Sequence, residues 1–185
     1  MYLLVNIFGN NLKKYGGMKR ILFLLVFALG VVKSFSQEQI NVGINGGLTI
    51  GSTEIPADFG FGAEANYLFD LFSEEFVLGP SIGISIFPST VDIVDTAMFL
   101  PISGAFRFQS LDDPFYVGIN LGYALGLGDF DGGFHLKPLV GYHISNSLKL
   151  NAFYSGIRNG DNSIGYFGLG LTFNFLGAEN SYYSY

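Results

Sequence analysis

GLGLTFNF, residues 168–175, alternates large apolar residues with small or polar ones. Alternation with a period of two is the pattern of a β-strand whose two faces meet different surroundings. Seven earlier segments share this pattern, and together the eight comprise residues 40–50, 59–69, 76–86, 98–108, 115–125, 134–144, 148–157 and 165–175. The sequence therefore predicts an all-β protein of eight antiparallel strands.

The composition of the two strand faces indicates which one points outward. One face, which carries Ile40, Val42, Ile44, Leu48 and Ile50 in the first segment, has no charged residue in any of the eight segments. The opposite face is rich in glycine and carries four charged residues: Glu64, Arg107, Lys137 and Lys149. A water-facing exterior carries about 25–35% charged residues, whereas small residues suit the cramped interior of an eight-stranded barrel. We therefore predict an up-and-down transmembrane β-barrel whose apolar face contacts lipid.

Composition supports this prediction. Of the 185 residues, 49% are hydrophobic and 13% are charged, against about 25% charged in a typical soluble domain. Each segment matches the roughly 9–11 residues with which a tilted strand crosses a bilayer. The absence of cysteine excludes disulfides and cysteine metal sites.

Aromatic residues of the outward face gather at the strand ends, as expected of interfacial girdles in membrane barrels. One end carries Tyr67, Phe69, Phe76, Phe106, Phe108, Phe115, Tyr142, Phe173 and Phe175, and the other carries Phe59, Phe61, Tyr123, Phe134 and Tyr154. Three prolines inside the segments, Pro80, Pro101 and Pro138, lack a backbone N–H. We expect bulges there, or strand boundaries that avoid them.

The N-terminal region has the pattern of a secretory signal peptide at residues 18–36. Lys19 and Arg20 precede an apolar run at 21–32, and Ser34 and Ser36 provide the small residues of a cleavage site after Ser36. The run is shorter than the roughly 20 residues that span a bilayer as a helix. We expect residues 1–17 to be an over-long N-terminal extension, 37–175 to be the barrel and 176–185 to be a short tail.

The motif Gly170-x-x-Phe173-x-Phe175, together with the signal peptide and the eight segments, resembles the outer-membrane β-barrel domain family. Its small members are the eight-stranded OmpA-like and OmpX-like barrels, which are porin-family-like. The resemblance implies secretion through the inner membrane and residence in the bacterial outer membrane. It also implies that Gly170, Phe173 and Phe175 form an assembly signal. The implied partners are outer-membrane lipid, periplasmic chaperones and the assembly machinery, and the implied state is a monomer.

The inward-facing polar residues form the candidate interior cluster: Glu64, Arg107, Lys137, His143 and Lys149. Buried charges must be paired or hydrated. We therefore expect a polar plug that closes the lumen, with a proton or ion path as the alternative. The presumed outer loops carry acidic residues that could bind a divalent cation: Glu54, Asp58, Asp92, Asp95, Asp129, Asp131 and Asp161. They lack the ligand spacing of an EF-hand loop, so we expect solvated loops with no metal and no cofactor.

An enzymatic role would depend on His135 and His143 with nearby serines. Both histidines alternate into the lumen, away from a lipid substrate, and the chain has no His-Glu-x-x-His motif. Its one Gly-x-Ser-x-Gly pattern, at residues 79–83, lies inside a predicted strand and not at the strand-to-helix turn of a nucleophile elbow. The formal net charge of −6 disfavours nucleic-acid binding. We predict a non-enzymatic outer-membrane barrel with a structural or surface-interaction role. A narrow porin or small-ligand channel is the alternative; a lipid-modifying enzyme and a soluble lipocalin-like carrier with the two faces swapped are further ones.

Overall fold

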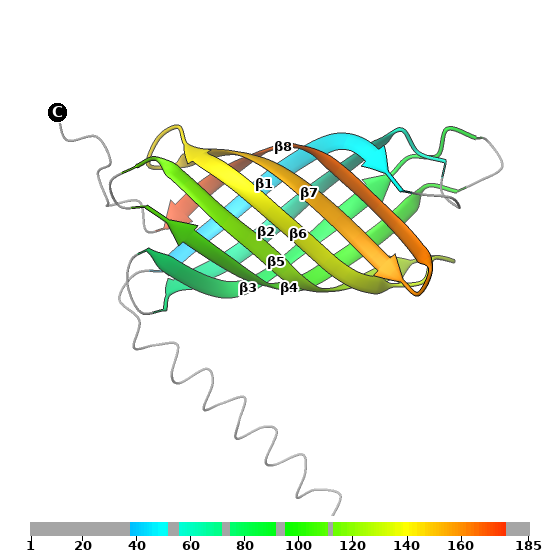
Figure 1. Cartoon of the computed structure of the whole chain (residues 1–185), viewed down its shortest axis with the longest axis horizontal. Coiled ribbons are helices and arrows are strands. Elements are labelled where there is room, and N and C mark those ends of the chain that lie inside the picture. The colour runs from blue at the N-terminus through cyan, green and yellow to red at the C-terminus, as the bar shows by residue number, and fades with distance from the viewer. Residues whose placement is uncertain (1–37, 52–55, 72–74, 92–94, 111–112, 177–185) are drawn as a thin grey trace, which may run out of the picture. The chain divides into compact units, whose positions relative to one another are not determined.

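Eight antiparallel strands close into a barrel in the computed structural model, which describes residues 38–51, 56–71, 75–91, 95–110 and 113–176. The strands are β1 (Glu38–Ile50), β2 (Phe59–Asp70), β3 (Phe76–Phe87), β4 (Ala97–Gln109), β5 (Phe115–Leu127), β6 (Gly133–His143), β7 (Leu148–Asn159) and β8 (Asn162–Leu176). Each strand pairs with its neighbours in sequence, and β1 pairs with β8 (Figure 1). The predicted fold class and all eight strands are confirmed. The predicted signal peptide and most of the predicted tail lie outside the described residues.

The barrel has two distinct ends (Figure 1). At the terminal end, β1 begins, β8 ends, and residues 71–75, 110–114 and 144–147 connect the strands. At the loop end, the connections are residues 51–58, 88–96 and 128–132 and the two-residue turn between Asn159 and Asn162. Gly160 in that turn has a φ of +60°, which glycine adopts without steric cost. The two longest connections, residues 51–58 and 88–96, therefore lie at the loop end.

The closing pair of strands depends on glycine. A Cβ atom on Gly168 of β8 would collide with the backbone carbonyl oxygen of Gly46 on β1. Gly47 is equally constrained by the carbonyl oxygen of Phe167. The β1–β8 register runs through these residues and shifts once, between Ile40 and Asn41. Close backbone approach at the seam is thus possible only because side chains are absent there.

The expectation that the inner prolines introduce bulges is wrong. The register is the same on both sides of each proline, but two residue pairs are missing from the ladder between the proline and one neighbouring strand. The loss is on the β2 side for Pro80, the β3 side for Pro101 and the β7 side for Pro138. On its other side each proline stays in register, opposite Gly104, Ala124 and Ile119 respectively. The barrel therefore accommodates the missing donors by local opening of one ladder.

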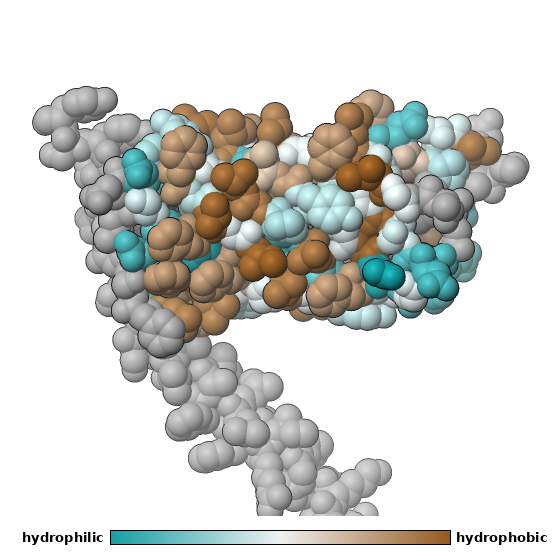
Figure 2. Space-filling view, in the orientation of Figure 1, coloured by the Kyte–Doolittle hydropathy of each residue, from teal (hydrophilic) through white to brown (hydrophobic). Residues whose placement is uncertain are grey.

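The apolar face points outward, as predicted. Ile44 is 63% exposed and Phe175 is 67% exposed, whereas Asn41, between outward positions of β1, is buried. Figure 2 shows apolar residues spread over the strands, with the most hydrophilic residues toward the two ends. Phe61, Ile82 and Leu121 are also exposed, so the alternative of a soluble carrier with swapped faces is wrong. Within the described ranges, no helix is long and apolar enough to cross a membrane.

Candidate functional site: the barrel interior

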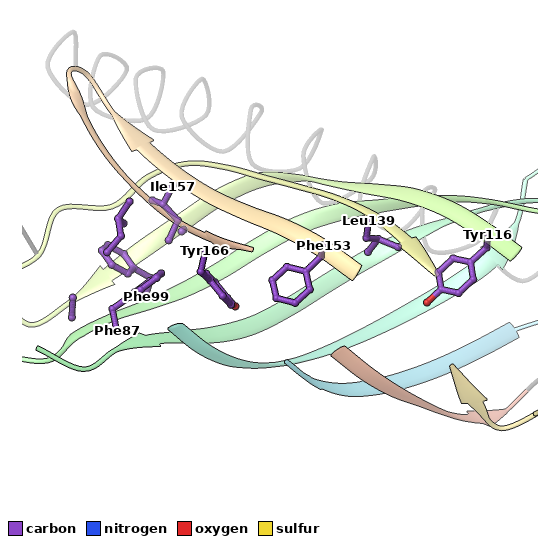
Figure 3. Close-up of a cluster of buried hydrophobic side chains, with 10 residues drawn as sticks. Phe87, Phe99, Tyr116, Leu139, Phe153, Ile157 and Tyr166 are labelled. Atoms are coloured by element: carbon purple, nitrogen blue, oxygen red, sulfur yellow. The ribbon is translucent and has the colours of Figure 1, made fainter. Parts of the chain in front are cut away.

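An apolar cluster fills the interior toward the loop end. We call its six large buried residues toward the loop end the aromatic plug: Phe87, Phe99, Phe153, Ile157, Ile164 and Tyr166. The cluster also includes Ala97 and Ala124 and continues through Leu139 to Tyr116. The Tyr166 ring contacts those of Phe87 and Phe153 edge-on, with centroids 5.4 and 5.2 Å apart (Figure 3). Two residues outside the strands, Ala57 and Phe130, pack against the same cluster. The plug therefore joins the walls of the barrel to its loops.

The sequence reasoning missed this plug. It described the inner face as small and polar, although Phe99, Phe153 and Tyr166 alternate inward within the predicted segments. The signal that could have found it is the position of these rings on the inner face. Glycines make room for them: a Cβ on Gly60 of β2 would lie 2.8 Å from the Tyr166 ring.

A buried ion pair crosses the middle of the interior. Lys137 Nζ on β6 lies 2.7 Å from Glu64 Oε2 on β2, with side-chain exposures of 4% and 13%. Asn120 Nδ2 is 3.5 Å from the same oxygen. The Lys137 ammonium also lies 4.7 Å from the centre of the Phe153 ring, within the range of a cation–π contact. The structure therefore brings together two of the five predicted cluster residues, on strands that are not neighbours in the sheet.

His135 links three strands in the same region. Its Nδ1 is 2.9 Å from Ser103 Oγ on β4, and its Nε2 is 3.1 Å from Ser155 Oγ on β7. The side chain is buried at 3% exposure. In the part of the chain that the structure describes, no carboxylate is hydrogen-bonded to this ring, so the arrangement lacks the orienting group of a catalytic triad. The His135 side chain thus connects β6 to β4 and β7 by hydrogen bonds, and we call this arrangement the His135 strut.

The other three predicted residues form a second group toward the terminal end. Arg107 donates from Nη1 to the carbonyl oxygens of Phe106 and Ile119, at 2.9 and 3.2 Å. Lys149 Nζ donates to Gln39 Oε1 at 3.2 Å. The His143 ring stacks on Tyr116 with centroids 5.2 Å apart. The predicted cluster is thus divided into a central pair and a terminal group.

Glycine again positions a charged side chain in this second group. A Cβ on Gly118 of β5 would collide with Cδ of Arg107. The absence of that Cβ lets the Arg107 side chain lie against the β5 backbone, where it reaches the Ile119 carbonyl. A strand glycine that admits a close neighbour in this way is a common use of glycine in sheets.

Little free space remains among these residues. One cavity, lined by Arg107, Lys149 and Glu64 among others, has room for about one or two water-sized particles. A second cavity, lined by Glu64, Lys137 and His135 among others, has room for at most about one. Glu64 borders both cavities and therefore marks the boundary between the central and terminal regions.

Several solved structures are similar in fold to this chain. The outer-membrane protein Ail of Yersinia pestis matches with a TM-score of 0.55 and 11% sequence identity, over 75% of this chain and 100% of Ail. A second match is the N-terminal barrel domain of Pseudomonas aeruginosa OprF, with a TM-score of 0.51 and 14% identity over 75% of this chain and 98% of that domain. A third is Neisserial surface protein A, with a TM-score of 0.51 and 15% identity over 76% of this chain and 98% of that protein. This chain has the fold of the small outer-membrane β-barrels. No family model and no curated protein matches its sequence.

At such low sequence identities the similarity shows a shared fold. The positions of the residues in the predicted assembly signal are therefore taken from the structure of this chain itself. Phe173 and Phe175 lie on the outer surface of β8, 50% and 67% exposed, while Gly170 faces inward. Their predicted role as an assembly signal stays a prediction.

The acidic residues of the presumed outer loops lie at the loop end, where the structure describes Asp58, Asp95, Asp129, Asp131 and Asp161. Glu54 and Asp92 are outside the described residues. Among the residues that are described, no group of three or more His, Asp or Glu side chains is arranged to hold a metal ion.

Proposed function

We propose that this protein is an integral protein of the bacterial outer membrane that presents its loop end at the cell surface and keeps its interior filled. In this proposal it reaches the membrane by secretion and assembly and stays a monomer. Its role is structural or one of surface interaction, without catalysis. The observation that carries the proposal is the combination of an apolar exterior with a packed, partly charged interior.

The exterior supports membrane residence on energetic grounds. Exposed large apolar side chains occur on all eight strands, whereas the largest apolar patch of a soluble monomer is typically about 300–600 Å². In hydrocarbon the exposure of these side chains has no hydrophobic free-energy cost. Closure of the barrel also gives hydrogen-bond partners to the backbone groups that an open sheet edge would leave unpaired. A lipid environment therefore explains a surface that water would not tolerate.

The interior supports presentation over conduction. The aromatic plug, the Glu64–Lys137 pair and the His135 strut each connect strands across the lumen. An eight-stranded barrel leaves an interior that side chains can fill, and here large rings occupy it toward the loop end. The narrow porin, the alternative from the sequence, would require these contacts to open together.

The non-enzymatic part of the proposal is supported by the burial of both histidines. His135 and His143 are 3% and 5% exposed and face the interior, so lipid substrates on the outer surface do not reach them. A catalytic base must lie within hydrogen-bonding reach of the proton that it abstracts.

The loop end provides the surface for interaction in this proposal. Ail, an attachment invasion locus protein, has been crystallised with the heparin analogue sucrose octasulfate, and Neisserial surface protein A is named for its location. The described part of this loop end carries Asp58, Asp95, Asp129 and Asp131 in its connections. Like charges repel across an interface, so we propose a partner other than a sulfated polyanion.

Fractionation with surface proteolysis tests location and topology. We expect the protein to stay with outer membranes after carbonate extraction and to show heat-modifiable gel mobility. Protease added to intact cells should cut within residues 51–58 or 88–96 and leave the connections at the terminal end intact. Release into the carbonate supernatant would contradict membrane residence, and cleavage only at 71–75 or 110–114 would reverse the orientation.

Planar-bilayer recording tests the filled interior separately. We expect no channel events from the wild-type protein, and the variant Glu64→Gln examines whether the central ion pair controls conduction. Steady unitary currents from the wild type would favour the porin alternative over presentation.

A further inference from the structure

The charges inside the barrel do not balance. By strand alternation the inner face of the described strands carries three cations, Arg107, Lys137 and Lys149, and two carboxylates, Glu64 and, as the last residue of β2, Asp70. Glu64 is paired with Lys137 at 2.7 Å. Arg107 and Lys149 are only 6% and 8% exposed, and they donate hydrogen bonds to uncharged oxygens of Phe106, Ile119 and Gln39. Among the described residues neither Arg107 nor Lys149 has a carboxylate within salt-bridge distance, and Glu64 is already paired with Lys137. Burying two such cations is energetically unfavourable unless another negative charge compensates them.

Both cations border the same cavity at the terminal end. Its lining includes Gln39, Asn41 and Asn151 in addition to Arg107 and Lys149. In the described structure Arg107 uses only Nη1 for hydrogen bonds to protein oxygens, and Lys149 makes one such bond. The guanidinium and ammonium groups thus retain donors for a further acceptor.

The size and polarity of the cavity restrict what it can hold. It has room for about one or two water-sized particles, so a bulky organic anion does not fit. Asn41 Oδ1, in a residue only 2% exposed, has no hydrogen-bond partner and lines the same cavity. That oxygen can accept a hydrogen bond, which an anion cannot donate.

We propose that this cavity binds one halide-sized inorganic anion, such as chloride, between Arg107 and Lys149, together with a water molecule that donates to Asn41. Glu64 lines the inner part of the same cavity and would repel the anion, but its carboxylate is neutralised by Lys137. The anion is therefore held on the terminal side of the central pair. It serves as a structural counter-ion that fastens β4 to β7 through the interior.

Anomalous diffraction tests the site directly. Crystals of the full chain would be grown from detergent in sodium bromide and, in parallel, in sodium gluconate. We expect an anomalous bromide peak between the Arg107 guanidinium and the Lys149 ammonium, absent from the gluconate crystals. Bromide crystals without a peak, with water alone in the cavity, would overturn the proposal.

A stability titration tests the site in solution at constant ionic strength. Because the anion binds the folded state, the unfolding equilibrium constant should fall about tenfold for each tenfold rise in chloride above its dissociation constant. Gluconate should have no such effect. Equal stability of the wild type in chloride and gluconate would contradict the proposal without requiring any variant to fold.

Two variants separate the site from general salt effects. Lys149→Gln removes one of the two cations, and we expect it to abolish the difference between chloride and gluconate. The matched control is Arg158→Gln, which removes an exposed cation from the same strand and should retain the full chloride dependence. Chloride dependence that survives Lys149→Gln and disappears in Arg158→Gln would place the anion elsewhere.

Discussion

Replacing Lys137 with methionine should destabilise the barrel strongly. The substitution keeps an unbranched side chain of similar length but removes the ammonium group that lies 2.7 Å from Glu64 Oε2. Of the hydrogen bonds that the described residues make to this carboxylate, the one from Asn120 Nδ2 at 3.5 Å would then remain. Breaking a buried ion pair by removing one partner costs about 3–5 kcal/mol. We expect a loss of this size in the free energy of unfolding, to which the lost contact with Phe153 also contributes.

The double variant Glu64→Gln/Lys137→Met distinguishes an unpaired charge from a simple packing defect. Removing both members of a buried pair is often neutral or stabilising. We therefore expect the double variant to lie within about 1–2 kcal/mol of the wild type, and so to be more stable than Lys137→Met alone. A coupling energy of that sign is the signature of a direct interaction.

Urea titration in detergent micelles measures these differences. The chain has no tryptophan, so the folded fraction is best taken from the folded and unfolded bands of an unheated gel. Arg158→Met, an exposed substitution on β7, is the control and should shift stability by no more than about 0.5 kcal/mol. A Lys137→Met loss below about 1 kcal/mol, or a double variant as unstable as the sum of the singles, would refute the reasoning.

Three further substitutions examine the seam, the exterior and the plug. Gly168→Ala should prevent stable closure because its Cβ would collide with the β1 backbone. Gly104→Ala should fold like the wild type because its Cβ would make only an ordinary contact, 3.9 Å from the Leu121 carbonyl oxygen; gel mobility after refolding measures both variants. Leu121→Arg, at the middle of the exposed face of β5, should cost about 2–4 kcal/mol in lipid vesicles, and a neutral result would count against lipid contact there. Tyr166→Phe should cost about 1 kcal/mol through loss of the 2.6 Å hydrogen bond to Asn45, and an unchanged urea midpoint would contradict that role.

Much of the fold was predictable from the sequence because strand alternation is a local property. Val42 and Asn41 lie on opposite faces of their strand whatever the rest of the chain does, because successive residues of a strand face opposite sides. The absence of charge from one face then indicated which of the two points outward. The same rule located Glu64, Arg107 and Lys149 on the inner face. The expectation of bulges at the prolines was wrong for a different reason. A missing N–H can open the hydrogen-bond ladder to one neighbouring strand without changing the register, and only the pairing of the strands shows whether a bulge or a local opening occurs.

What the sequence determined by itself was therefore the number of strands, their alternation and the apolar character of the exterior. Only the tertiary structure decided that Lys137 meets Glu64, 73 positions earlier in the chain, while Arg107 and Lys149 share a separate cavity. It also decided that inward rings such as Tyr166 gather into a plug. The physical reason is that contacts across the lumen depend on strand tilt and on the stagger with which β1 meets β8, and both are set by closure of the whole barrel.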